Sequence, residues 1–114
     1  MSDCLFCSIA DGKIKASVVY QDDAVVAFKD IAPRAPVHIL IIPRKHVIGV
    51  PEIEDGDRAL IGKIFQVAAK LAREQGIAEG GFRVVVNSGA DAGQSVFHLH
   101  YHLLGGRRMN WPPG

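Results

Sequence analysis

The feature that most constrains this chain is a run of alternating histidines near its C-terminal end. Residues 98–102 read His-Leu-His-Tyr-His, and they hold three of the five histidines in the 114-residue sequence. A strand points successive side chains to opposite faces, so the imidazoles would share one face, and Phe97, Leu99, Tyr101 and Leu103 the other. Imidazole titrates near neutral pH, binds metals and can attack phosphorus. The run therefore predicts a strand that carries a functional site.

Composition restricts the class of protein. A chain of 114 residues that is 48% hydrophobic suits one domain with one core. The net charge of +1, from 13 basic and 12 acidic residues, gives no basic excess for nucleic acid or an anionic membrane. Apolar runs such as residues 39–42 are too short to span a bilayer. The N-terminus lacks the pattern of a signal peptide, so we expect a cytoplasmic protein with neither nucleic acid nor membrane as partner.

The order of predicted elements indicates an α+β fold with an antiparallel sheet. Apolar residues at helical spacing predict one long amphipathic helix over residues 60–72, with Asp55 or Asp57 at its start and Gly76 at its end. A short helix is expected over Cys4–Ala10. Short apolar segments bounded by turn residues predict the strands, which are Val18–Tyr20, Ala24–Lys29, Val37–Ile42, Phe82–Asn87 and Val96–Leu104.

A loop of small residues leads into the histidine run. Residues 87–95 read Asn-Ser-Gly-Ala-Asp-Ala-Gly-Gln-Ser, a composition that lets backbone N–H groups approach an anion. The loop has neither the ending of a P-loop nor the context of a dinucleotide fingerprint, and alone it is equally a plain connection. Strict alternation with large apolar residues between the histidines argues against a merely polar sheet face. Two functional interpretations stay open at this point: a metal site, and nucleophilic and acid–base catalysis at a phosphate.

The chain resembles the histidine triad (HIT) superfamily, specifically its HINT branch of purine nucleoside phosphoramidases. Histidine at position 102 separates it from the galactose-1-phosphate uridylyltransferase branch, which usually has glutamine there, and the chain has no room for the DNA-binding zinc module of the aprataxin branch. The matching segments run through nearly the whole sequence: residues 28–33, 35–38, 41–46, 86–87, 93–95, 98–102, 104–107 and 111–114.

The resemblance implies a fold, an assembly and an activity. The fold would be HIT-like, with a five-stranded antiparallel sheet, one long and one short helix, and sheets joined across a homodimer. Residues 1–114 would form a single HIT domain whose tail, residues 105–114, contributes to the dimer and to the partner's active site. The activity would be hydrolysis of the P–N bond in purine nucleoside 5′-phosphoramidates or related aminoacyl adenylates, through a nucleotidyl-histidine and without a catalytic cofactor.

The resemblance also assigns roles to the catalytic residues. His100 would be the nucleophile, which requires its neutral form, and imidazole with a pKa near ~6.5 is largely neutral at pH 7. His102 would bind the phosphate with support from His38, and His98 would orient the nucleophile through its backbone carbonyl. Ser95 would lie near the departing amine.

A further set of residues would bind the nucleotide. Asp30 would accept hydrogen bonds from both ribose hydroxyls, although a turn-capping role explains it equally well without the resemblance. Core packing is likewise an alternative for the apolar residues of the purine slot. The resemblance also places Gly93, Gln94 and Ser95 around the phosphate. It places Asn87 on the ribose–phosphate side and Trp111 of the partner's tail beside the site. The full set is Asp30, Ile31, Phe28, Phe6, Ile9, Gly93, Gln94, Ser95, Asn87, His100, His102 and Trp111.

A structural zinc site is implied by some relatives that carry a cysteine pair. Here the ligands would be Cys4, Cys7, His46 and His98, a Cys₂His₂ set that leaves no open position for catalysis. The alternative is two plain thiols on a short helix. Two other functions stay open: a nucleotide-binding regulatory module with little catalysis, and a zinc hydrolase that uses all three histidines of the run as ligands.

Overall fold

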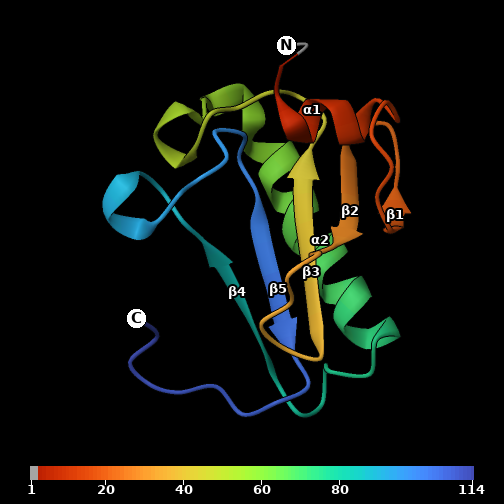
Figure 1. Cartoon of the computed structure of the whole chain (residues 1–114), viewed down its shortest axis with the longest axis vertical. Coiled ribbons are helices and arrows are strands. Elements are labelled where there is room, and N and C mark those ends of the chain that lie inside the picture. Colours follow the sequence, from red (N-terminus) through yellow and green to blue (C-terminus); the bar gives the residue numbers. More distant parts are fainter. Residues whose placement is uncertain (1–2) are drawn as a thin grey trace.

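The computed structural model describes residues 3–114 as a five-stranded antiparallel sheet with a helix on each face (Figure 1). The strands lie in the order β1-β2-β3-β5-β4. The predicted α+β fold is therefore confirmed. The bounds are β1 Val18–Gln21, β2 Val25–Lys29, β3 Val37–Pro43, β4 Phe82–Val86 and β5 Tyr101–Gly105, with α1 Leu5–Ala10 and α2 Arg58–Glu74; short 3₁₀ turns lie at Val50–Glu52, Asp55–Asp57 and Ala90–Ala92.

The two faces of the sheet have different coverings. On one face α2 packs along the central strands, where Ile39, Ile41 and Leu103 meet Ile64 and Leu71 in the main core. On the other face the shorter α1 covers only one end of β2 and β3 (Figure 1). This second core is made by Phe6 and Ala10 from α1 and by Val26, Phe28, Leu40 and Ile42 from the strands. The rest of that face is left open for a site.

The long helix begins and ends close to the predicted positions. Asp57 occupies the N-cap position of α2, but its carboxylate does not cap a helical N–H group. It accepts hydrogen bonds from Glu54 N at 2.9 Å and Lys45 Nζ at 2.6 Å, and so fixes the turn before the helix. After the last turn, Gly76 takes a φ of +75°, a left-handed conformation that glycine adopts without strain.

The histidine strand is shorter than predicted. Strand β5 begins at Tyr101, so His98 and His100 precede the ladder, and Phe97 is 59% exposed instead of sharing the apolar face. Continuing the register from the Ile41–Tyr101 pair would bring Leu99 opposite Pro43, which has no N–H to donate. The Pro43 carbonyl instead lies 2.8 Å from His98 Nε2, and Leu99 N donates to Val47 O at 2.6 Å. Pairing therefore covers His102 but neither His98 nor His100, which frees these two for other contacts.

Within the described residues, no helix combines the length and apolar character needed to cross a membrane.

Candidate active site

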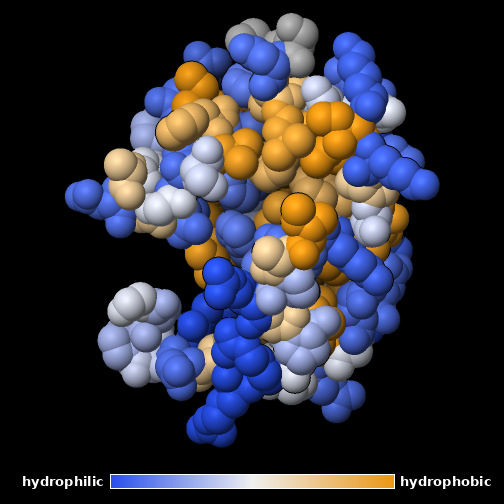
Figure 2. All heavy atoms as spheres, in the orientation of Figure 1, coloured by the Kyte–Doolittle hydropathy of each residue, from blue (hydrophilic) through white to orange (hydrophobic). Residues whose placement is uncertain are grey.

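The histidine run borders a pocket of about 460 Å³ on the open face of the sheet, next to α1. Apolar side chains gather on this face below α1 (Figure 2). The lining combines aromatic and aliphatic walls with His100, His102, Asp30 and Ser95. A mostly apolar hollow with a few polar groups along one side is the usual form of a small-molecule site.

One hydrogen bond determines which ring nitrogen of His100 carries the proton. Its Nδ1 lies 2.8 Å from the backbone carbonyl of His98, and a carbonyl only accepts, so Nδ1 carries the proton. In the neutral ring, Nε2 therefore holds the free lone pair. The ring is 7% exposed and meets Phe6 edge-on, with centroids 5.1 Å apart. His100 is thus a buried imidazole held in the tautomer that a nucleophile needs.

A chain of hydrogen bonds assigns the protons of His38 and His102. Arg34 N donates to His38 Nδ1 at 3.0 Å, so the neutral His38 ring carries its proton on Nε2. That nitrogen lies 2.9 Å from His102 Nδ1 and 3.4 Å from a carboxylate oxygen of Asp30. Because His102 Nδ1 accepts from His38, His102 carries its own proton on Nε2. We call Asp30, His38 and His102 the proton relay; it presents His102 as a hydrogen-bond donor beside His100.

Burial keeps the rings of this relay neutral. It lowers the pKa of His102 to about 4, with further contributions from the neighbouring rings of His100 and His38, while Asp30 acts in the opposite direction. Burial also lowers the pKa of His38, and Asp30 again opposes the shift. Both rings are therefore neutral at pH 7 in the empty pocket. A neutral His102 can still donate from Nε2 to an anion.

Asp30 and the apolar walls have two roles each. One carboxylate oxygen of Asp30 accepts from Ala32 N at 2.8 Å, the turn-forming contact, and the other faces His38. Phe6 and Phe28 are buried in the second core and also line the pocket, where their centroids are 5.5 Å apart. Ile9 lines the same wall. Ile31 is fully exposed at the rim of the pocket, a position that a bound ligand would cover.

The loop before the histidines contributes less to this pocket than its sequence suggests. Ser95 lines the pocket, whereas Gly93 and Gln94 do not. The Gln94 side chain accepts from Gly89 N at 2.9 Å and donates to the carbonyls of Ile48 at 2.8 Å and Val96 at 3.2 Å. Its amide is thus fully engaged in bracing the loop. Gly93 has a φ of +80° and turns the chain after the 3₁₀ turn.

Two further predicted contacts lie outside the pocket. Asn87 lines a neighbouring cavity, which it shares with His38 and His102. Trp111 is 83% exposed on the tail and lines neither cavity. Arg34, for which no sequence pattern predicted a role, supplies the first N–H of the relay. Any residue except proline carries that group, so no side-chain signal points to it.

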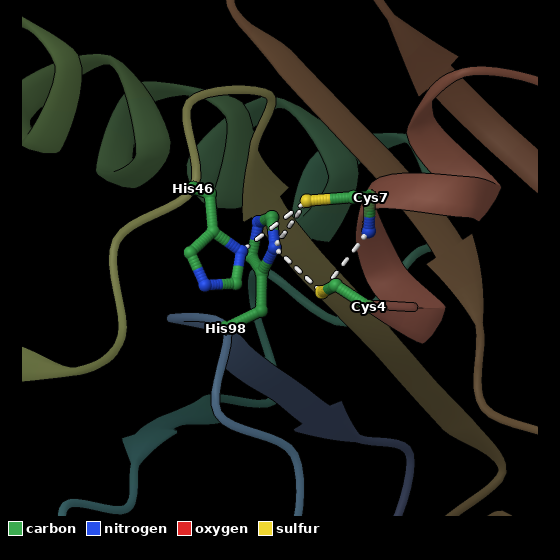
Figure 3. Close-up of side chains that lie close together, drawn as sticks. All are labelled: Cys4, Cys7, His46 and His98. Carbon is green, nitrogen blue, oxygen red and sulfur yellow. Dashed lines mark hydrogen bonds between the residues drawn. The ribbon is translucent and has the colours of Figure 1, made fainter. Parts of the chain in front are cut away.

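Four side chains from three distant segments form a second cluster beside α1 (Figure 3). The Sγ atoms of Cys4 and Cys7 each lie 3.4 Å from His98 Nδ1, and Cys7 Sγ lies 3.2 Å from His46 Nδ1. We call Cys4, Cys7, His46 and His98 the Cys–His cluster. Its four ligand atoms lie within 4.8 Å of one another.

The chemistry of the Cys–His cluster fits a tetrahedral zinc ion. His98 Nε2 donates to the Pro43 carbonyl, so its Nδ1 lone pair faces the two thiols. A carbonyl that fixes a ligating histidine in this way is typical of zinc sites. Burial raises the pKa of the Cys7 thiol, with the neighbouring Cys4 adding to the shift. A bound cation would reverse that cost by stabilising the thiolates.

Comparisons with known proteins agree with this geometry. The HIT domain family matches residues 11–109. Adenylylsulfatase HINT1 of Arabidopsis thaliana is 45% identical over 115 residues, which cover 99% of this chain and 78% of that protein. The crystal structure of a HIT family hydrolase from Legionella pneumophila is 50% identical, with a TM-score of 0.97 over 98% of this chain and 100% of the other. The chain belongs to the HIT family, which confirms the resemblance identified in its sequence.

A more distant solved structure contains zinc. It is a zinc-bound histidine triad family protein from Mycobacterium smegmatis, 30% identical, with a TM-score of 0.80 over 94% of this chain and 77% of the other.

Proposed function

We propose that this protein hydrolyses purine nucleoside 5′-phosphoramidates and related adenylates through a covalent nucleotidyl-histidine on His100. The observation that carries the proposal is the 2.8 Å contact between His100 Nδ1 and the His98 carbonyl, which leaves a free lone pair on Nε2 of a buried ring that lines the pocket. Membership of the HIT family and the hydrolase names of two relatives support the reaction class.

The reaction takes place in two displacements. His100 Nε2 attacks the α-phosphorus, a nitrogen–phosphorus bond forms, and the P–N bond of the substrate breaks with its electron pair leaving on the amine. The departing amine takes a proton from solvent, and the Ser95 hydroxyl, which lines the pocket, would hydrogen-bond to it. Water attacks the phosphorus next, releasing the nucleoside monophosphate and the free imidazole of His100.

The proton relay would stabilise the charge that gathers on the phosphoryl oxygens. His102 donates from Nε2 because His38 occupies its Nδ1 at 2.9 Å, and His38 is set in turn by Arg34 N. A donor whose direction is fixed before the substrate arrives costs no reorganisation during the reaction. The Asp30 carboxylate lies 3.4 Å from His38 Nε2. Its negative charge raises the pKa of His38 and of His102, against the effect of burial.

The apolar end of the pocket would hold the base. Phe6, Ile9 and Phe28 form its wall, and Ile31 at the rim would close over the ring. One carboxylate oxygen of Asp30 accepts from Ala32 N, and the other, which also faces His38 at 3.4 Å, would accept from the ribose hydroxyls. The phosphate would meet the backbone around Gly93, Gln94 and Ser95, with Asn87 on the ribose–phosphate side.

Zinc would have a structural role in this protein. We assign Cys4, Cys7, His46 and His98 as its ligands, with all four coordination positions filled by protein. Zinc there would anchor the segment whose carbonyl orients His100. The two cysteines form no disulfide, which fits a reducing compartment such as the cytoplasm.

We further propose a homodimer in which the tail, residues 105–114, reaches the partner's site. Met109 and Pro113 of this tail line a cavity of their own subunit, whereas Trp111, a large aromatic residue that is 83% exposed, lines neither cavity, which supports a contact with the partner. The test mixes His100→Ala chains with Trp111→Ala chains, each weakly active alone. Activity well above the sum of the two would support exchange of tails between subunits, and simple additivity or a monomer in sedimentation would contradict it.

The reaction itself is tested with a panel of adenylates. Wild type and His100→Ala are assayed with adenosine 5′-phosphoramidate, an aminoacyl adenylate and adenosine 5′-phosphosulfate, the last because a relative is named an adenylylsulfatase. Turnover by wild type and its loss in His100→Ala are expected. Tight AMP binding with turnover no faster than solution hydrolysis would instead favour a regulatory module, and loss of turnover on chelation with the fold intact would favour a catalytic metal.

A further inference from the structure

A second cavity of about 290 Å³ lies against the other side of His102. It shares His102 with the nucleotide pocket but does not include His100. Its lining holds three arginines and no carboxylate. The arginines are Arg34, Arg83 and Arg107, and they line the cavity together with His38, Asn87 and His102.

The three arginines keep unused hydrogen-bond donors. Arg83 donates one N–H to Asn110 O at 2.9 Å, and Arg107 donates to the carbonyls of Arg34 at 3.0 Å and Arg108 at 3.1 Å. Among residues 3–114, the Arg34 guanidinium has no hydrogen bond, and no carboxylate lies within 4.0 Å of any of the three. A guanidinium has five N–H groups, so most of their donors face solvent or the cavity. Three uncompensated positive charges around one hollow favour an anionic occupant.

We propose that this arginine cavity binds the leaving group of the substrate and selects leaving groups that carry a negative charge, such as a carboxylate or a sulfate. This rests on the proposed function, because the attacking and departing atoms lie roughly in line across the phosphorus. With His100 attacking from the nucleotide pocket, the leaving group departs away from His100. The arginine cavity shares His102 with the nucleotide pocket and is not lined by His100, so it borders the phosphate position assigned to His102 away from the nucleophile.

The charge of the leaving group decides whether it must take up a proton as it departs. A sulfate or carboxylate leaves with the electron pair of the broken P–O bond and needs no proton at neutral pH. An amine that bears a carboxylate elsewhere still takes a proton on nitrogen after the P–N bond breaks, and its carboxylate remains on the arginines. Arg34, Arg83 and Arg107 would therefore act in binding and specificity, while His100 and His102 act on the phosphorus.

The experiment compares two substrates that differ by one charge. Both are adenosine 5′-phosphoramidates, one formed with the amino group of glycine and one with that of glycinamide, so the P–N bond is the same. The variant Arg34→Gln/Arg83→Gln removes two cavity charges and spares Arg107, which braces backbone carbonyls. Arg73→Gln, an exposed arginine on α2 on the opposite face of the sheet, is the matched control.

We expect wild type to prefer the glycine adduct. The double variant should lose about 10–100-fold in kcat/KM with that adduct and less than about 3-fold with glycinamide. Arg73→Gln should change neither value. Adenosine 5′-phosphosulfate should lose activity in parallel with the glycine adduct, and a loss confined to glycine would narrow the site to carboxylates. Equal losses with glycine and glycinamide, or no wild-type preference, would overturn the proposal and leave the hydrolase intact.

Binding provides a readout that does not need turnover. In the His100→Ala background, the affinity for the glycine adduct should exceed that for glycinamide, and the two arginine substitutions should remove the difference. If wild type hydrolyses neither adduct, the proposed function fails. The binding data still test the arginine cavity in that case. A preference for the glycine adduct that the two substitutions abolish supports the proposed anion site, and equal affinities for the two adducts overturn it.

Discussion

Two side-chain clusters of this protein begin at histidines of the same run but have opposite designs. In the Cys–His cluster, the proton of His98 is held by the Pro43 carbonyl, and its lone pair faces two thiols. In the proton relay, the lone pair of His102 is filled by His38, and its N–H is left for the pocket. The first is a closed set of four ligands, and the second is open on one side. His100 lies between them and depends on the carbonyl of His98.

The difference shows how one spacing supports three kinds of chemistry. Identical side chains two residues apart receive different tautomers because a different backbone or side-chain group contacts each ring. The lone pair of His98 and the N–H of His102 are set by partners outside the run, Pro43 and His38, whereas the lone pair of His100 is set by the backbone carbonyl of His98 within it. A three-ligand metal site on residues 98, 100 and 102 does not fit this pattern, since His102 Nδ1 is already occupied and His98 faces the cysteines.

The largest expected effect comes from removing the imidazole of His100, which lies between the Cys–His cluster and the proton relay. His100→Ala should lower kcat/KM for adenosine 5′-phosphoramidate by at least about 10³-fold, because the reaction loses its nucleophile. Circular dichroism and the melting temperature should stay near those of wild type. A variant that keeps most of its activity would show that the covalent route through His100 is wrong.

Breaking the closed cluster should affect stability more than chemistry. Cys7→Ser removes a ligand and should reduce bound zinc from about one per chain to none, as measured by metal analysis of protein purified without chelators. The melting temperature should fall by about 10 °C or more, while activity per folded molecule at low temperature stays within about 10-fold. Ser8→Ala, a buried neighbour on the same helix, is the control. Wild type with no zinc, or full loss of activity in folded Cys7→Ser, would contradict a structural role.

Breaking the open relay should do the reverse. His38→Ala leaves His102 Nδ1 without its donor, so the His102 proton is no longer directed into the pocket. We expect about a 10–100-fold fall in kcat with zinc content unchanged. Asp30→Asn should mainly raise KM, because its carboxylate is assigned to the ribose. An unchanged kcat in His38→Ala would remove the relay from the mechanism.

The smallest effect is a dependence of stability on pH. The pKa of His102 is about 4 in the folded protein and near ~6.5 when unfolded, so the unfolded state binds more protons between these values. Stability should therefore be full above about pH 6.5 and decline as pH falls toward 4. For this half-buried ring the decline should amount to at most about 2 kcal/mol. The free energy of unfolding of wild type minus that of His102→Gln, measured across this pH range, gives the contribution of His102. A difference that does not change with pH would contradict the prediction.

Sequence reasoning reached the fold because periodicity and breakers are local signals. Strands β1–β4 and both helices lie within one or two residues of the predicted ranges, and the chain belongs to the predicted family. The exception, the start of β5, depends on Pro43, which is 56 residues earlier in the chain than Leu99. A proline is visible in the sequence, but its partner in the sheet is not until the register is known.

The site was harder to predict for the same reason. The pocket brings His100, His102, Asp30, Ser95 and the Phe6 wall together. Gln94 turns its amide to the backbone of Ile48, 46 residues away, and the Arg34 N–H that begins the relay is not a side-chain property. The arginine cavity combines residues from three separate segments, none of which forms a basic cluster in sequence.

The most direct test of the central claim is to trap the covalent intermediate. Wild-type protein is mixed with adenosine 5′-phosphoramidate, quenched within the first turnovers and analysed by mass spectrometry of its peptides. We predict an adenylyl group on His100 and on neither His98 nor His102, because only His100 has its Nε2 lone pair free beside the pocket. An adduct on another residue, during normal turnover, would contradict the division of roles among the three histidines.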